Sequence, residues 1–148
     1  MDRQQDFQLD VAGYLIVRNV LTAEDIEQHL AGLEAEDDVA TAALCERPTL
    51  QVYLQQLCGP NHALSGVTGL LPTTTDPDSL AGGGHEPLDW SLAYQKQGDV
   101  RFCQSLVVIW ALADVAAGDG GFIIVPASHN SQVEVPASLR SGDDSMGL

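Results

Sequence analysis

Apolar and polar positions along the first third of this chain predict a strand followed by a helix. A short amphipathic piece around Phe7 leads into a β-type apolar run at residues 14–17, which we expect to be the first strand. Thr22 then offers the hydroxyl of a helix N-cap, and acidic side chains follow it in the first turn. The buried stripe of this helix is expected at positions three or four apart: Ile26, Leu30 and Leu33.

A second helix is predicted to begin at Pro48, because proline is tolerated in a first turn, where its missing N–H had no partner. Gly59-Pro60 should end it. Its apolar stripe is expected to comprise Leu50, Tyr53, Leu54 and Leu57. From residue 63 to residue 71 the pattern alternates loosely and is broken by glycines, which favours a strand.

The second half of the chain carries the strongest β pattern. A long segment rich in glycine and proline, residues 72–89, is expected to be a flexible loop. Strands are predicted at 90–95 and 100–115, and the stretch 105–112 is so apolar that we expect a central, buried strand there.

A Gly-Asp-Gly-Gly turn follows at 118–121, and a second buried strand is predicted at 122–125. The stretch from 102 to 129 would then form one hairpin with a cavity behind it. The polar tail, 138–148, is expected to fray.

Composition narrows the class of protein. A chain of 148 residues with 45% hydrophobic and 18% charged residues predicts a single globular domain over residues 1–148. Its formal charge of −15 would repel nucleic acid and acidic membrane surfaces, so we expect neither as a partner. The same charge favours solubility. A polar N-terminus without an apolar leader predicts a cytoplasmic location. The odd number of cysteines (Cys45, Cys58 and Cys103) predicts buried, reduced thiols.

Two stretches resemble the phytanoyl-CoA dioxygenase family, a branch of the Fe(II)/2-oxoglutarate oxygenases. The first is Phe7 with the run GYLIVRNVLT at 13–22, followed by Glu24 and Ile26. The second and more specific one is VVIWALADV at 107–115, GDGGF at 118–122 and VPASH at 125–129. The resemblance covers the N-terminal and central parts of the family's domain.

This resemblance implies an α+β protein with a double-stranded β-helix (a cupin-like jelly roll), here incomplete, and with N-terminal helices packed on the sheet. It also implies Fe(II) and 2-oxoglutarate as cofactors, and the hydroxylation of a small or lipid-like molecule. Such iron sites use two histidines and one carboxylate on one face of the metal. No catalytic residue and no 2-oxoglutarate contact can be assigned in this chain.

The iron ligands that the resemblance implies are not all present. A His-x-Asp pair is expected shortly before the core strand, but WSLAYQ at 90–95 contains neither residue. The nearest candidates are His85 and Asp89, with Glu86 as a weaker carboxylate. A loop histidine or carboxylate in so acidic a chain can equally be a solvated surface group.

His129, at the close of the Pro-x-Ser-His corner, is the third candidate metal ligand, and its alternative role is to stabilise the corner. The family's second iron histidine and its 2-oxoglutarate arginine lie well beyond that corner. No histidine follows His129, and Arg140 lies too close to the corner to match the arginine. We assign no chemistry to His29 and His62.

Three hypotheses remain open from the sequence. The chain is an oxygenase with an unusual ligand set, or a non-catalytic jelly-roll relative that binds a small apolar ligand or another protein. Alternatively, it is an incomplete product whose open sheet edge allows a homo-oligomer to form. Aromatic residues at 90, 94 and 110 line a ligand pocket in the first two readings and belong to the core otherwise.

Overall fold

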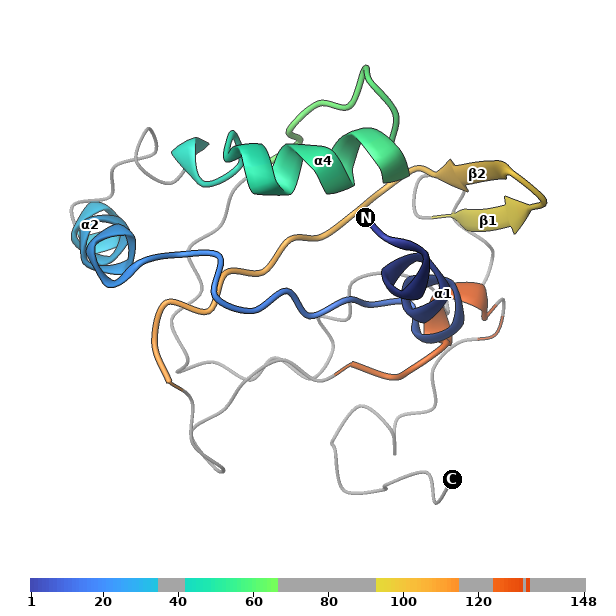
Figure 1. The fold of residues 1–148 in the computed structure, drawn as a ribbon, viewed down its shortest axis with the longest axis horizontal. Helices are drawn as coiled ribbons and strands as arrows, with labels where there is room; N and C mark the ends of the chain where they lie inside the picture. Colours follow the sequence, from blue (N-terminus) through green and yellow to red (C-terminus); the bar gives the residue numbers. More distant parts are fainter. Residues whose placement is uncertain (35–41, 67–92, 115–123, 132, 134–148) are drawn as a thin grey trace.

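The computed structural model of the protein describes residues 1–34, 42–66, 93–114, 124–131 and 133. These residues form three α-helices, a two-stranded antiparallel sheet and one turn of 3-10 helix (Figure 1). The elements are α1 (Arg3–Ala12), α2 (Ala23–Glu34), α4 (Pro48–Leu57), β1 (Tyr94–Gln97), β2 (Val100–Cys103) and η2 (Ser128–Asn130).

Helix α1 is closed at both ends by local hydrogen bonds. Asp2 and Gln5 form a capping box, in which the Gln5 N–H donates to Asp2 Oδ1 (2.8 Å) and the Asp2 N–H donates to Gln5 Oε1 (3.0 Å). At the other end Gly13 adopts φ +81°, and its N–H donates to the carbonyl of Leu9. The sequence pattern gave only a short amphipathic piece here.

The structure confirms the helices predicted after Thr22 and from Pro48. Thr22 and Asp25 form reciprocal hydrogen bonds at the start of α2, where the Asp25 N–H donates to Thr22 Oγ1 and the Thr22 N–H donates to Asp25 Oδ2. The same Asp25 carboxylate accepts two bonds of 3.0 Å from the guanidinium of Arg47, which precedes α4. This bidentate pair fastens α2 to the start of α4.

The sheet is a hairpin whose strands lie between residues 94 and 103. Tyr94 pairs with Cys103 and Lys96 with Arg101, and the turn contains Gly98 at φ +62°. This hairpin begins inside the predicted 90–95 strand and includes the beginning of the predicted 100–115 strand. Its turn, however, was not anticipated.

Two predicted strands differ in the structure. Residues 14–17 and 105–112 belong to no strand, and both follow irregular paths. Of the predicted 63–71 and 122–125 strands, residues 63–66 and 124–125 are irregular, and the other residues lie outside the described ranges. The predicted 102–125 hairpin is thus not formed by the residues that the structure describes, and these contain no double-stranded β-helix. For the chain as a whole, the jelly roll stays a prediction.

The buried apolar side chains are few and come mainly from the helices: Leu9, Leu44, Leu50, Leu57 and Ala93. Large apolar side chains on the two irregular segments remain accessible, with Ile16 60% and Val107 59% exposed. A strand buries such side chains only when a partner strand or a helix covers it. Polar contacts made by α1 therefore hold many of the described elements together.

Candidate functional site

One face of the β1–β2 hairpin brings together the side chains of Tyr94, Lys96, Arg101 and Cys103, because these are the directly paired positions 94–103 and 96–101. Two cations facing each other across an antiparallel pair repel one another. The hairpin therefore needs a carboxylate next to Lys96 and Arg101, and α1 supplies it.

Asp6 of α1 is that carboxylate. Its Oδ2 accepts from Lys96 Nζ at 3.0 Å, and its Oδ1 is hydrogen-bonded to the guanidinium of Arg101, whose side chain is only 13% exposed. The hydrogen bond from Lys96 is the largest cause that lowers the pKa of Asp6, and Arg101 adds to it against the opposing effect of burial. Burial by itself lowers the pKa of Arg101, but its bonds to Asp6 and Tyr94 outweigh that and raise it.

Asp10 lies one helical turn after Asp6 and binds the side chain of Tyr94 in the hairpin. The Tyr94 hydroxyl donates to Asp10 Oδ1 at 2.7 Å. Burial, and then this bond to a carboxylate, raise the pKa of the Tyr94 phenol to about 12. Spacing of four residues on a helix places Asp6 and Asp10 on one face, which matches the spacing of the hairpin's donors.

His129 of η2 packs on the other side of Tyr94. The two rings lie 5.1 Å apart between centroids at an interplanar angle of 57°. Nε2 of His129 lies 3.0 Å from the carbonyl oxygen of Asp10 and 3.0 Å from Nδ2 of Asn130, so its role as donor or acceptor depends on the tautomer. Nδ1 of His129 is buried without a hydrogen-bond partner among the described residues, next to Gly13.

The corner that carries His129 is fastened to the end of α1 through its backbone as well. The Ala127 N–H donates to the carbonyl of Ala12 at 2.8 Å. Ala127 has φ +65°, a conformation that favours glycine and costs an alanine about 1 kcal/mol. The contact between the corner and α1 therefore holds Ala127 in a strained backbone conformation.

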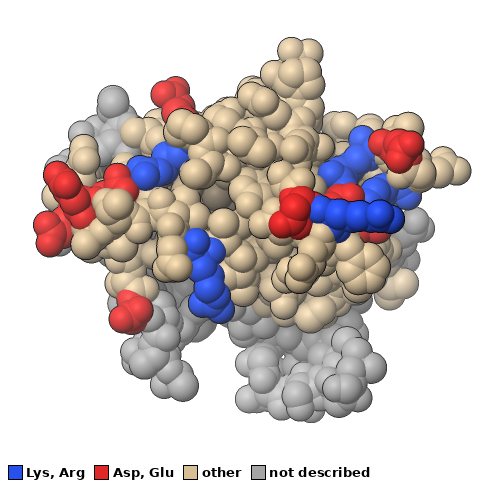
Figure 2. Space-filling model, in the orientation of Figure 1, with Lys and Arg blue, Asp and Glu red and all other residues tan. Residues whose placement is uncertain are grey.

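We call these residues the α1 junction: Asp6, Asp10, Tyr94, Lys96, Arg101 and His129. Figure 2 shows basic side chains crowded against acidic ones on the side of the molecule where α1 and the hairpin lie. These pairs locally neutralise the negative charge that dominates the composition. Of this set, only Tyr94 and His129 were expected from the sequence to have a role in a site. The available signal was the pair of acidic residues four apart on α1.

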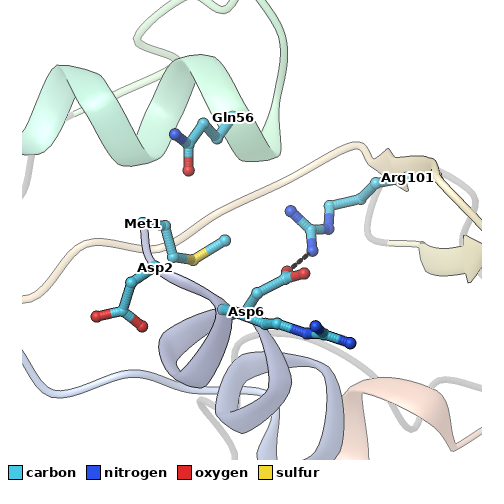
Figure 3. A pocket seen from close by; sticks show the side chains of 6 residues that line it. Met1, Asp2, Asp6, Gln56 and Arg101 are labelled. Carbon is cyan, nitrogen blue, oxygen red and sulfur yellow. Dashed lines mark hydrogen bonds and ion pairs between the residues drawn. The ribbon is translucent and has the colours of Figure 1, made fainter.

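An open hollow of about 340 Å³ lies beside the α1 junction. Figure 3 shows Gln56 of α4 on one side, Met1 and Asp2 on another, and the Asp6–Arg101 pair toward the hairpin. Pockets for small apolar molecules are mostly lined by hydrophobic and aromatic groups. This hollow instead has a charged lining in which Arg101 is already paired, so it differs from the cavity that the resemblance implies.

Of the three predicted metal ligands, only His129 falls within the described residues. His85 and Asp89 lie outside them, as does Glu86. The described part of the chain holds no group of three or more His, Cys, Asp or Glu side chains arranged to bind a metal ion. Nδ1 of His129 is buried next to the backbone of Gly13.

Comparison of the chain with protein-family models, with curated proteins and with solved structures found no match. The resemblance to the phytanoyl-CoA dioxygenases thus rests on the sequence pattern alone. Among the described helices, none has both the length and the apolar character required to cross a bilayer.

The lowered pKa values of Asp6 and Asp25 predict a loss of stability in acid. Hydrogen bonds to Lys96 and to Arg47, respectively, are the largest causes of the two shifts. Both carboxylates contribute fully above their ordinary pKa of 3.8, and the contribution is lost as pH falls through the folded-state values. We expect urea midpoints to fall steadily from about pH 5 to about pH 2. Asp25→Asn should flatten this dependence, and an unchanged slope would contradict the assignment.

Proposed function

We propose that this protein is an Fe(II)/2-oxoglutarate-dependent dioxygenase-like protein of the phytanoyl-CoA dioxygenase kind, whose reaction is the hydroxylation of a small or lipid-like molecule. The observation that carries the proposal is the ordered pattern between residues 107 and 129, which ends in Pro126-Ala127-Ser128-His129. A tight corner docked on α1 at these four residues supports it, because the resemblance implies a corner at this point.

His85 and Asp89 are the residues we propose as iron ligands. Imidazole and carboxylate are the donors that a mononuclear iron site of this class uses, and the four-residue spacing lets both reach one ion from a single segment. His129 is the third predicted ligand, and its ligation of iron stays a prediction. The described geometry supports a structural role for it, because its Nε2 contacts Asp10 and its Nδ1 is buried near Gly13.

When bound, Fe(II) with 2-oxoglutarate supplies the oxidising chemistry in this class of protein. The contribution that we propose for the described residues is architectural. The α1 junction holds the hairpin, the helix and the 126–129 corner together at one point. That arrangement orders the chain on both sides of the segment that carries His85 and Asp89.

A second candidate function is a non-catalytic relative that binds a small molecule or a second copy of the chain. The observation that favours it is the placement of His129, whose ring packs on Tyr94, contacts Asp10 through Nε2 and buries Nδ1 beside Gly13. The exposed apolar side chains of residues 107–109 favour the same reading, since they would be buried in a homo-oligomer formed through unpaired backbone.

Anaerobic titration with Fe(II), followed by calorimetry, separates the two functions. The oxygenase proposal predicts saturable one-to-one binding that His85→Ala and Asp89→Ala each weaken at least tenfold. Asp99→Ala is the matched control, because Asp99 is an exposed carboxylate in the hairpin turn and should leave binding unchanged. Iron and 2-oxoglutarate together should also raise the melting temperature of the chain.

Failure of the wild-type chain to bind Fe(II) saturably would reject the oxygenase proposal and leave the non-catalytic one. Binding that survives both substitutions would reject His85 and Asp89 as the ligands. Sedimentation velocity on the same samples tests the homo-oligomer, which predicts a mass that rises with protein concentration.

A further inference from the structure

We propose that Cys58 and Cys103 form a thiol pair that a disulfide oxidant such as oxidised glutathione converts to an intramolecular disulfide, thereby fastening α4 to the β1–β2 hairpin. This inference goes beyond the proposed function, because it requires neither iron nor 2-oxoglutarate. The two cysteines are 45 positions apart in the chain, and they lie at the ends of two elements that contact each other.

The fold brings the two residues together through the ends of two elements. Cys58 is the C-terminal cap of α4, where its N–H donates to the carbonyl of Leu54 at 2.8 Å. Cys103 is the last residue of β2, and β2 contacts α4. Figure 1 shows the end of β2 next to the end of α4 at this point. Both cysteines are half-buried and reduced in the structure.

The thiol of Cys103 donates to the carbonyl of Ser105 at 3.4 Å. Cys58, at the end of the helix that β2 contacts, lies near enough to influence the pKa of this thiol. Burial raises the pKa of Cys103 most, the charge and hydrogen bond of Cys58 raise it further, and Arg101 opposes both. Cys103 therefore stays protonated at neutral pH. A raised pKa makes Cys103 a weak first nucleophile, so the proposed exchange begins at Cys58.

The exchange proceeds in two balanced steps. The Cys58 thiolate attacks one sulfur of oxidised glutathione, so a mixed disulfide forms and one glutathione thiolate leaves. Cys103 then loses its proton and attacks the Cys58 sulfur, so the protein disulfide forms and a second glutathione leaves. The two protein thiols together give up two electrons and two protons, and oxidised glutathione receives them as two thiols.

The bond would close a loop that runs from residue 58 to residue 103. Restricting a loop of this size in the unfolded chain stabilises the folded state, and we expect the melting temperature to rise by roughly 10 °C on oxidation. The loop includes His85 and Asp89, so the redox state would also restrict the segment that carries the proposed iron ligands.

The test is a thiol count on the full chain after equilibration with oxidised glutathione. Maleimide labelling in denaturant, followed by mass spectrometry, should find one labelled cysteine after oxidation and three after reduction. Non-reducing peptide mapping should join Cys58 to Cys103. The matched control is Cys45→Ser, since Cys45 is also half-buried and reduced but precedes α4, and this variant should keep the bond and the rise in melting temperature.

Cys58→Ser and Cys103→Ser should each abolish both the bond and the rise in melting temperature. Peptide mapping of the wild-type chain decides the matter even where a serine variant fails to fold. Three labelled cysteines after oxidation, glutathione adducts without an internal bond, or a bond that includes Cys45 would each overturn the proposal.

Discussion

Gly13→Ala should destabilise the folded chain by about 3 kcal/mol, the largest effect that we expect from a single methyl group. Gly13 ends α1 at φ +81°, where an L side chain costs about 1 kcal/mol. A Cβ on Gly13 would also run into the imidazole of His129, which is held between Asp10 and Tyr94. Urea denaturation followed by circular dichroism measures the loss.

Gly98→Ala is the matched control for Gly13→Ala. Gly98 has φ +62° in the hairpin turn, and a Cβ there would meet nothing within 4 Å. The control should therefore lose about 1 kcal/mol from backbone strain alone. Equal losses for the two variants would show that the contact between Gly13 and His129 is not tight. The double variant Gly13→Ala/His129→Ala should lose less than the sum of the single variants.

Asp6→Asn should lower the free energy of unfolding by about 2 kcal/mol, because it leaves Lys96 and Arg101 opposite each other without a carboxylate. This value lies between those for exposed and buried ion pairs, since Arg101 is mostly covered and Lys96 is more accessible. Guanidinium is a salt that screens such pairs, so urea is the denaturant to use.

Asp99→Asn removes the same charge from the turn of the same hairpin, where Asp99 is exposed, and should change stability by less than about 0.5 kcal/mol. Adding salt should reduce the difference between wild type and Asp6→Asn. If Asp6→Asn lowered the free energy of unfolding no more than Asp99→Asn, the α1 junction would not be a source of stability.

The helices could be predicted from the sequence because their determinants are local. Thr22 and Asp25 lie three residues apart and cap α2 by themselves, and Pro48 together with Gly59 bounds α4. Helix α1 was harder to recognise, since the capping pair of Asp2 and Gln5 precedes a helix with little apolar character.

The strands could not be predicted in the same way, because a strand depends on a partner that is distant in sequence. The apolar runs at 14–17 and 105–112 have strand composition, yet neither pairs with another described segment. The hairpin that does form has a more polar first strand, and its turn at Gly98 supplies the local signal. Within the described residues, apolar composition thus overestimated the sheet, whereas the turn residues would have located the hairpin.

The candidate site likewise combines residues that have a local sequence signal with contacts between distant segments that have none. His129 could be singled out from the Pro-x-Ser-His pattern, but its contact with Asp10 spans 119 positions and leaves no local trace. The pairing of Asp6 with Lys96 spans 90 positions. The local signal that was not used is the four-residue spacing of Asp6 and Asp10, which places two carboxylates on one face of α1.

The contact between α1 and His129 also affects the order in which the chain can fold in the cell. A ribosome synthesises α1 more than a hundred residues before the 126–129 corner that covers its C-terminal end. At about 5 to 20 residues per second, the helix waits several seconds or more for that contact. During this interval only local bonds can keep α1 helical: the capping box of Asp2 and Gln5 at its start, and the bond from the Gly13 N–H to the carbonyl of Leu9 at its end.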